Sequence, residues 1–186
     1  MKKHSVAMSS QLKTFGALFT AISAFHVNAN ELELSINDEL IDLRFTSGYE
    51  QDFAGQLAFM HSDFNDLSAD KISYRFFTRD SESGLELGAK VFWLDVEKEG
   101  GFGIALGGGI NRSLSDKLDL GLQVYYAPDI VTGGDFKNML EYDLRLNYQM
   151  VENGSFFFGY RKIEADNGNF DLEVFDNSYF GLKFEF

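Results

Sequence analysis

The residue best suited to acid–base chemistry in this sequence is a histidine. Of the three histidines, His4 and His26 lie in an N-terminal segment that we expect to be removed, which leaves His61. Ser62 and Asp63 follow it, and a histidine beside a nucleophile is the minimum for hydrolytic chemistry. Adjacent residues of a strand point to opposite faces, so Ser62 is a poor partner and a dyad would need a residue from a neighbouring strand. A histidine at a strand end, facing a membrane interface, is the simpler interpretation.

A second chemically capable set consists of polar and charged residues at alternate positions in separate segments. If each segment is a strand, these residues share one face of it. Both signs occur, and opposite charges that face one another across a narrow interior pair rather than stay free. The set is Arg75, Glu86, Lys90, Asp119, Gln123, Glu141, Asp143, Arg145 and Arg161. We predict that they line the interior of a barrel, either as a salt-bridged filling or around a narrow passive pore.

The elements that must position these residues are strands. The segment 140–150 (LEYDLRLNYQM) alternates apolar and polar residues throughout, and a period of two is typical of a strand. Similar alternation occurs around 32–36, 41–45, 57–61, 72–76, 85–93, 102–110, 118–126, 156–160 and 179–186. No helical period is of comparable strength. Gly103, Gly107 and Gly109 fall on one face, where they leave space that a bulky neighbour such as Tyr125 can fill.

The N-terminal residues 1–29 predict a secretory signal peptide. Lysines precede an apolar run over 15–25, and Val27-Asn28-Ala29 has the form of a cleavage site. The run is too short to span a bilayer as a helix. We therefore expect cleavage after Ala29 and a mature domain of 30–186. No later segment approaches about 18 uninterrupted apolar residues, so a membrane-spanning mature chain would have to be a barrel.

Three features favour a membrane barrel over a soluble one with the same alternation. The better strands run for about nine to eleven residues, the length that a tilted strand needs to cross hydrocarbon. Short connections at 47–52, 80–84, 112–116 and 151–154 alternate with longer ones at 62–70, 95–100, 127–138 and 165–177. Aromatic residues lie on the apolar face near strand ends, as interfacial girdles require: Trp93, Phe102, Tyr126, Tyr142, Tyr148, Phe156 and Tyr160. We therefore predict that both termini are periplasmic and that the longer connections lie outside the cell.

Composition disfavours several classes of function. The chain has no cysteine, which excludes disulfides and thiolate metal sites, and its formal charge of −13 disfavours nucleic acid as a partner. The acidic stretch 164–177 lacks the fixed ligand spacing of a calcium loop, and a solvated loop is the simpler interpretation. We expect neither a metal ion nor a cofactor.

The last strand and several internal segments carry a family resemblance. The chain stops at Phe186 after Phe180, Leu182 and Phe184 on one face. This resembles the terminal strand that outer-membrane proteins present to their assembly machinery. YYAP at 125–128, GYRKI at 159–163, GAKVF at 88–92, ALGGG at 105–109 and YFGLKFEF at 179–186 are similar to YfaZ-family outer-membrane proteins. The resemblance covers essentially the whole mature chain and implies a small outer-membrane barrel, but it brings no activity and no catalytic motif.

The sequence thus predicts an all-β protein, a transmembrane up-and-down antiparallel barrel of ten strands in the outer membrane of a Gram-negative bacterium. Eight strands is the alternative, if the short hairpin over 31–47 stays outside the wall. The expected partners are outer-membrane lipids, lipopolysaccharide and, through the strand ending in Phe186, the assembly machinery. The predicted role is structural or that of a narrow passive pore. The alternative is an enzyme that modifies lipid or lipopolysaccharide with His61.

Overall fold

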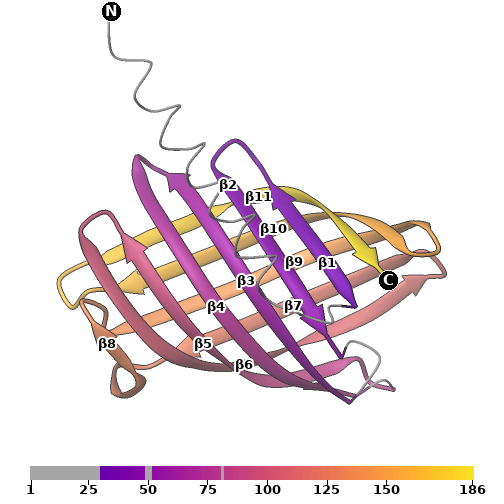
Figure 1. The fold of residues 1–186 in the computed structure, drawn as a ribbon, viewed down its shortest axis with the longest axis horizontal. Helices are drawn as coiled ribbons and strands as arrows, with labels where there is room; N and C mark the ends of the chain where they lie inside the picture. The colour runs from indigo at the N-terminus through magenta and orange to yellow at the C-terminus, as the bar shows by residue number, and fades with distance from the viewer. Residues whose placement is uncertain (1–29, 49–51, 81) are drawn as a thin grey trace, which may run out of the picture.

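The described chain is built almost entirely of strands (Figure 1). The computed structural model describes residues 30–48, 52–80 and 82–186, so the predicted signal peptide lies outside the described residues. The elements in order are β1 (Glu31–Ile36), β2 (Leu40–Ser47), β3 (Phe53–Phe64), β4 (Leu67–Arg79), β5 (Leu85–Val96), β6 (Glu99–Ser115), β7 (Leu118–Ala127), the 3₁₀ turn η1 (Asp129–Val131), β8 (Thr132–Gly134), β9 (Asn138–Val151), β10 (Gly154–Asp166) and β11 (Asp171–Glu185). No helix in this part of the chain is long and apolar enough to cross a membrane.

Ten of the eleven strands close into one antiparallel barrel. Neighbours in the chain pair with one another, β7 pairs with β9, and β1 pairs with β11 from Glu31 opposite Glu185 to Ile36 opposite Phe180. The predicted ten-stranded barrel is confirmed. The eight-stranded alternative is wrong, because the hairpin of β1 and β2 is part of the wall. The short strand β8 is additional, and it pairs with β6 beyond the point where β7 ends.

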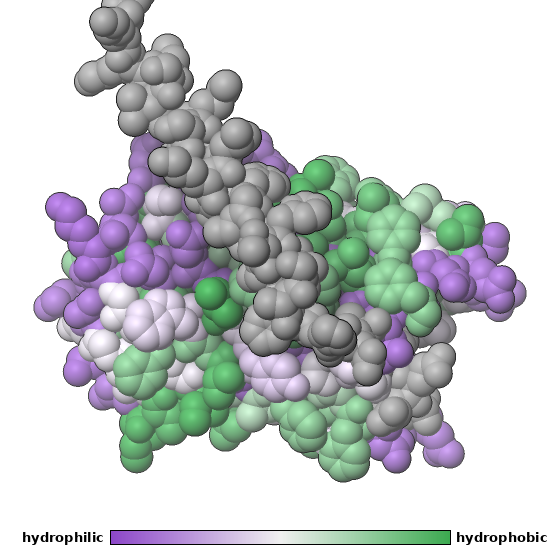
Figure 2. All heavy atoms as spheres, in the orientation of Figure 1, coloured by the Kyte–Doolittle hydropathy of each residue, from purple (hydrophilic) through white to green (hydrophobic). Residues whose placement is uncertain are grey.

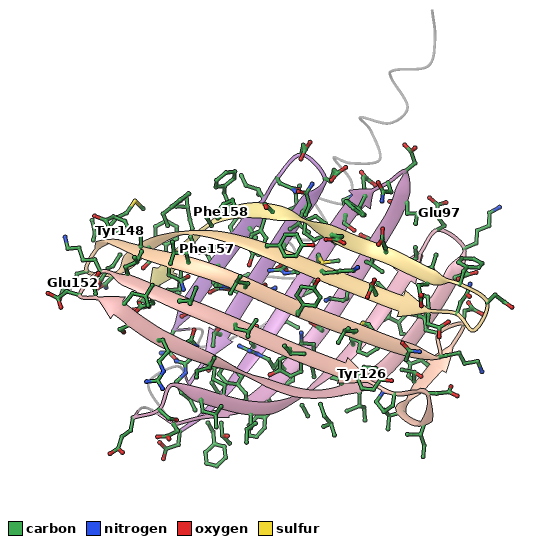
Figure 3. All side chains as sticks on the ribbon, turned by 180° about the vertical axis from the view of Figure 1, so that it is seen from behind. Glu97, Tyr126, Tyr148, Glu152, Phe157 and Phe158 are labelled. Carbon is green, nitrogen blue, oxygen red and sulfur yellow. The ribbon has the colours of Figure 1, made fainter. Side chains whose placement is uncertain are left out.

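Side chains alternate between the two faces of the wall, as a period of two requires. Phe157 points into the barrel and is 0% exposed, whereas its neighbour Phe158 points away from it and is 44% exposed (Figure 3). The outward positions form an apolar belt that includes Leu34, Ile72, Tyr74, Val91, Trp93, Ile104, Leu122, Val124, Leu144, Leu146, Phe158 and Leu182. Figure 2 shows hydrophilic residues gathered at the two ends of the barrel, with most of the hydrophobic ones between them. This is the arrangement of a barrel that spans a membrane.

The two ends of the barrel differ in their connections. We name the end that carries Glu31 and Glu185 the near end, and the end that carries β8 the far end. At the far end β3 and β4 are joined by Asn65 and Asp66, whose φ angles of 52° and 62° are those of a tight hairpin turn. Glu97, whose φ angle is 57°, and Lys98 join β5 to β6 in a second two-residue turn.

The predicted alternation of connection lengths is therefore wrong. Three of the four segments predicted as longer external connections, at 62–70, 95–100 and 165–177, are mostly strand, and the one after β7 stays long. The strands continue past the apolar belt, where charged residues such as Asp70 and Asp95 occupy outward positions. Charges in the sequence suggested loops, but the backbone pairing does not stop there.

The polarity of the wall inverts along the barrel. Within the belt, apolar residues face outward and polar residues face the lumen, whereas on β10 toward the far end Lys162, Glu164 and Asp166 face outward and Ile163 and Ala165 face inward. The far end thus has the polarity of a small soluble barrel, with an apolar interior and a charged exterior.

Candidate functional site

The middle of the lumen holds two aspartates and two arginines, Asp42, Arg44, Asp143 and Arg161, which we name the central ion cluster. Arg161 Nη1 lies 2.6 Å from Asp42 Oδ2, and Arg161 Nη2 lies 2.7 Å from Asp143 Oδ2. Arg44 lies 2.8 Å from Asp42 and 3.6 Å from Asp143. All four side chains are buried, because the alternation on β2, β9 and β10 turns them inward. Two cations balance two anions, so the cluster can remain ionised away from water.

Tyr179 supports this cluster from β11. Its hydroxyl donates a hydrogen bond to Asp143 at 2.6 Å, and the Arg161 guanidinium lies 4.6 Å from the centroid of its ring. The ring passes over Gly159, where an added Cβ would come within 2.5 Å of Tyr179 Cζ. Glycine at this position therefore makes room for the aromatic ring that orders the cluster.

Glu141 on β9 is shared by two lysines. It lies 2.7 Å from Lys71 Nζ and 3.0 Å from Lys90 Nζ. Lys90 also lies 4.4 Å from the centroid of the Tyr125 ring. As predicted, Tyr125 fills the space beside Gly107, where an added Cβ would come within 2.9 Å of its ring.

Glu86 and Arg145 extend the charged network toward the near end. Glu86 is fully buried and accepts hydrogen bonds from Arg75 at 3.5 Å and from Arg79 Nε at 2.8 Å. Arg145 Nη1 donates to Glu33 Oε1 at 2.8 Å. The lumen is thus crossed by charges in direct contact, as is expected for opposite charges in a narrow interior.

Toward the far end the lumen is filled by apolar side chains, which we name the apolar plug. The plug consists of Leu40, Met60, Ala69, Phe92, Leu94, Val96, Ala105, Ala127, Phe136, Met139, Ile163, Ala165, Leu172, Val174 and Phe175. Phe136 enters from the segment between β8 and β9 and is 3% exposed. Phe175 meets Phe64 edge to face, with ring centroids 5.9 Å apart. The plug separates the polar middle of the lumen from the far end.

The near end of the lumen is a polar cavity of about 280 Å³, which we name the near cavity. Six acidic and six basic side chains line it, so its walls carry no large net charge. Asp80 lies among them, beyond the end of β4. Hydrogen bonds from the Ser83 hydroxyl at 2.6 Å and the Glu82 amide at 3.1 Å lower the pKa of Asp80, so it stays anionic to a lower pH than a free aspartate.

All nine residues that the sequence assigned to the interior lie on the lumen side of the wall. Arg75, Glu86, Lys90, Glu141, Asp143, Arg145 and Arg161 are buried, and Asp119 and Gln123 are half-buried in the wall of the near cavity. Sequence reasoning missed several of their partners: Glu33, Asp42, Arg44 and Lys71. The signal was present, since ELELS at 31–35 and DLRFT at 42–46 alternate as regularly as the stronger segments.

His61 lies on the outside of the wall, near the far end of β3. Its Nδ1 lies 2.9 Å from Asp70 on β4, and its Nε2 lies 3.4 Å from Asp63. Ser62 points into the lumen and donates to the Val174 carbonyl at 2.8 Å. Both ring nitrogens of His61 face carboxylates, so neither is placed to take a proton from a nucleophile. Within the described ranges, no group of three or more His, Cys, Asp or Glu side chains is arranged to hold a metal ion.

Comparisons with solved structures return outer-membrane proteins. The NanC porin shares 10% identity and a TM-score of 0.46, with 84% of this chain and 99% of that one covered. The KdgM porin gives 10% and 0.43, with 84% and 98% covered. The outer-membrane channel DcaP of Acinetobacter baumannii shares 11% identity and a TM-score of 0.41, with 83% of this chain covered. The match spans about half (54%) of the DcaP chain. No curated protein matches the chain.

The family comparison covers nearly the whole sequence. The family described as YfaZ precursor matches residues 6–186. This range includes every strand of the barrel wall, the central ion cluster, the apolar plug and the near cavity. The chain therefore belongs to the YfaZ family.

Proposed function

We propose that this chain is a structural barrel of the outer membrane whose lumen is closed to solutes. The apolar plug carries the proposal, because members such as Leu94, Met139 and Phe175 are 0% exposed. Side chains packed to the density of a protein interior leave no room for a file of water molecules. Below the plug, an ion crossing the lumen would have to separate Arg161 from Asp42 and Asp143, which it holds at 2.6 and 2.7 Å.

In this proposal the far end projects beyond the bilayer and the near end, which carries Glu31 and Glu185, faces the periplasm. β1 pairs with β11 over 180–185, so residues 171–179 of β11 have no β1 partner within the described chain. Side chains donate hydrogen bonds to the backbone of this edge instead: Ser62 to the Val174 carbonyl and Asn37 to the Ser178 carbonyl. An open strand edge does not occur in hydrocarbon. A projecting end with the longest connection is typical of the external side of such barrels.

The proposed partners follow from the surface. The apolar belt contacts outer-membrane lipid, and the charged outward residues toward the far end lie at the level of lipopolysaccharide. Phe180, Leu182 and Phe184 are exposed on the outer face of β11, in line with the terminal Phe186. This face of β11 is the one that engages the assembly machinery before the barrel closes.

A narrow passive pore is the second candidate. The near cavity and the charged lumen favour it, because porin lumens are polar and water-filled. In this structure the route would still have to pass through the apolar plug. A pore would therefore need displacement of plug residues such as Phe136, which belongs to the segment between β8 and β9.

Planar-bilayer recording of the refolded protein separates the two candidates. We expect no discrete openings from the wild-type protein, while a general porin inserted under the same conditions conducts. Insertion is checked by heat-modifiable migration on a gel and by flotation with lipid vesicles. Reproducible discrete openings from wild-type protein would refute the closed barrel and favour the pore.

A further inference from the structure

The near cavity contains buried polar atoms that lack hydrogen-bond partners. Glu33 Oε2 and Arg75 Nε belong to residues in its wall that are 5% and 4% exposed, and neither atom has a partner within the described chain. Glu31 Oε2 also accepts no hydrogen bond, although the Lys183 ammonium lies 3.5 Å away. A buried polar group without a partner is unfavourable, and in a native protein it calls for an explanation. A bound ligand would supply the missing partners.

The carboxylate oxygens without a hydrogen bond and the donor without one lie on different strands of the cavity wall. Glu31 and Glu33 are neighbouring inward positions of β1, and each has its other oxygen engaged, by the Thr46 hydroxyl at 3.2 Å and by Arg145 at 2.8 Å. The unpaired donor, on Arg75, belongs to β4.

The backbone register joins the two sides of the cavity in one row. Glu31 lies opposite Thr46, Thr46 opposite Gln56, and Gln56 opposite Arg75. Gln56 donates to Thr46 at 3.0 Å, so the middle of the row is satisfied by its own side chains. Strands lie about 4.8 Å apart, so the ends of the row are separated by roughly 14 Å at the backbone. The long side chains of glutamate and arginine shorten that gap at the level of the ligand.

The chemistry of the unpaired atoms defines the ligand. Carboxylate oxygens accept hydrogen bonds and match an ammonium group, which carries three donors. A guanidinium N–H matches a carboxylate. Because acidic and basic residues in the wall balance, an ion of a single sign is not favoured over a dipolar one. We propose that the near cavity binds a small zwitterion, with its ammonium group at Glu31 and Glu33 and its carboxylate at Arg75.

The size of the cavity fits a compact ligand. A volume of 280 Å³ corresponds to roughly nine water molecules at about 30 Å³ each, which is enough for a zwitterion with a few carbon atoms between its charges. Binding there does not require passage through the apolar plug. The inference therefore goes beyond the closed barrel, and conductance results leave it unaffected.

Isothermal titration of the refolded protein in detergent micelles tests the proposal with three probes. 4-Aminobutanoate carries both charged groups, whereas butylamine and butanoate each carry one. We expect 4-aminobutanoate to bind at least about tenfold more tightly than either half-ligand, because each half loses one charge-assisted hydrogen-bonding partner. This comparison uses wild-type protein alone, so it stands even if a variant does not fold.

Variants then locate the site. Glu33→Gln and Arg75→Gln should each weaken binding of 4-aminobutanoate by about tenfold. Asp119→Asn is the matched control, because Asp119 lines the same cavity but its Oδ1 is already engaged by the Ser113 hydroxyl at 2.6 Å. Its affinity should stay close to that of the wild type. Equal binding of 4-aminobutanoate and butylamine, absence of binding, or equal loss in the control would overturn the proposal.

Discussion

Replacing Arg161 by methionine tests the energetic role of the central ion cluster. The Arg161 side chain is 1% exposed. Its guanidinium lies 2.6 Å from Asp42 and 2.7 Å from Asp143, closer to each aspartate than Arg44 does. Methionine keeps much of the volume and removes the charge. Asp42 and Asp143 then have Arg44 as their nearest remaining shared cation, at 2.8 and 3.6 Å. Arg145 also lies 3.5 Å from Asp143, but it is paired with Glu33 at 2.8 Å. Three buried carboxylates then share two arginines, so one negative charge is in excess.

The expected loss of stability is about 3–5 kcal/mol, the range for removing one partner of a buried ion pair. The Arg161 guanidinium also loses its contact with the Tyr179 ring, which adds about 0.5–2 kcal/mol where the ring is desolvated. Lys162→Met is the matched control, because Lys162 is the next residue of β10 and faces outward. Its ammonium lies 2.6 Å from Glu164, 3.4 Å from Asp176 and 3.7 Å from Glu173, on the solvent side of the wall. Surface ion pairs are screened by water and contribute little to stability, so the control should lose much less than Arg161→Met.

Urea unfolding in detergent or lipid vesicles measures both variants. Trp93 is the one tryptophan of the chain, and it lies in the apolar belt at 57% exposure, so its fluorescence reports transfer from an apolar environment to water. Gel migration without heating gives an independent measure of the folded fraction. A loss below about 1 kcal/mol for Arg161→Met, or equal losses in the two variants, would refute the assigned role of the cluster.

Three further predictions concern the belt, the glycine packing and the surface histidine. Leu146→Arg places a charge in the apolar belt and should lower the free energy of unfolding in lipid vesicles by up to about 2–4 kcal/mol, and an unchanged free energy would contradict the belt. Gly159→Val should cost about 1–3 kcal/mol, because its Cβ would meet the Tyr179 ring, and equal stability would contradict this packing. Neither the wild-type protein nor His61→Ala should modify labelled lipopolysaccharide or phospholipid. Turnover by the wild type that is lost in the variant would support the enzyme hypothesis.

Alternation of side chains was the part of the fold that sequence could predict. In the segment 140–150, Glu141, Asp143 and Arg145 follow one another at every second position, and a strand can place them on one face only. The structure places all three in the lumen. The face of a strand on which a residue lies depends only on the local sequence, so it can be predicted without knowing which strands are neighbours.

The partners of these residues could not be predicted in the same way. Asp42 meets Arg161 although 119 residues separate them, and this contact depends on the closure of β1 against β11 and on the register of every strand between. Alternation fixes the face of each residue but leaves its height along the barrel open.

The sequence predicts loops at the far end where the structure has strands, and the reason is physical. At Lys162, Ile163, Glu164 and Ala165 the alternation continues, but apolar residues now face inward and charged residues outward. The apolar outer face ends where the wall leaves the membrane, but the hydrogen-bonded pairing of the strands continues beyond that point. The predicted loops were therefore too long, and the apolar plug that these segments supply went unrecognised.

The side of the membrane from which a reagent reaches the lumen tests the central claim, a closed lumen, most directly. The chain has no cysteine, so a single introduced thiol can be labelled without background. Gln123→Cys places a thiol in the wall of the near cavity, and Met139→Cys places one in the apolar plug. In sealed vesicles with the barrel inserted in one orientation, a membrane-impermeant thiol reagent should modify Gln123→Cys from the near side alone and Met139→Cys from neither side. Labelling of Gln123→Cys from the far side would show a continuous aqueous route and contradict the closed lumen.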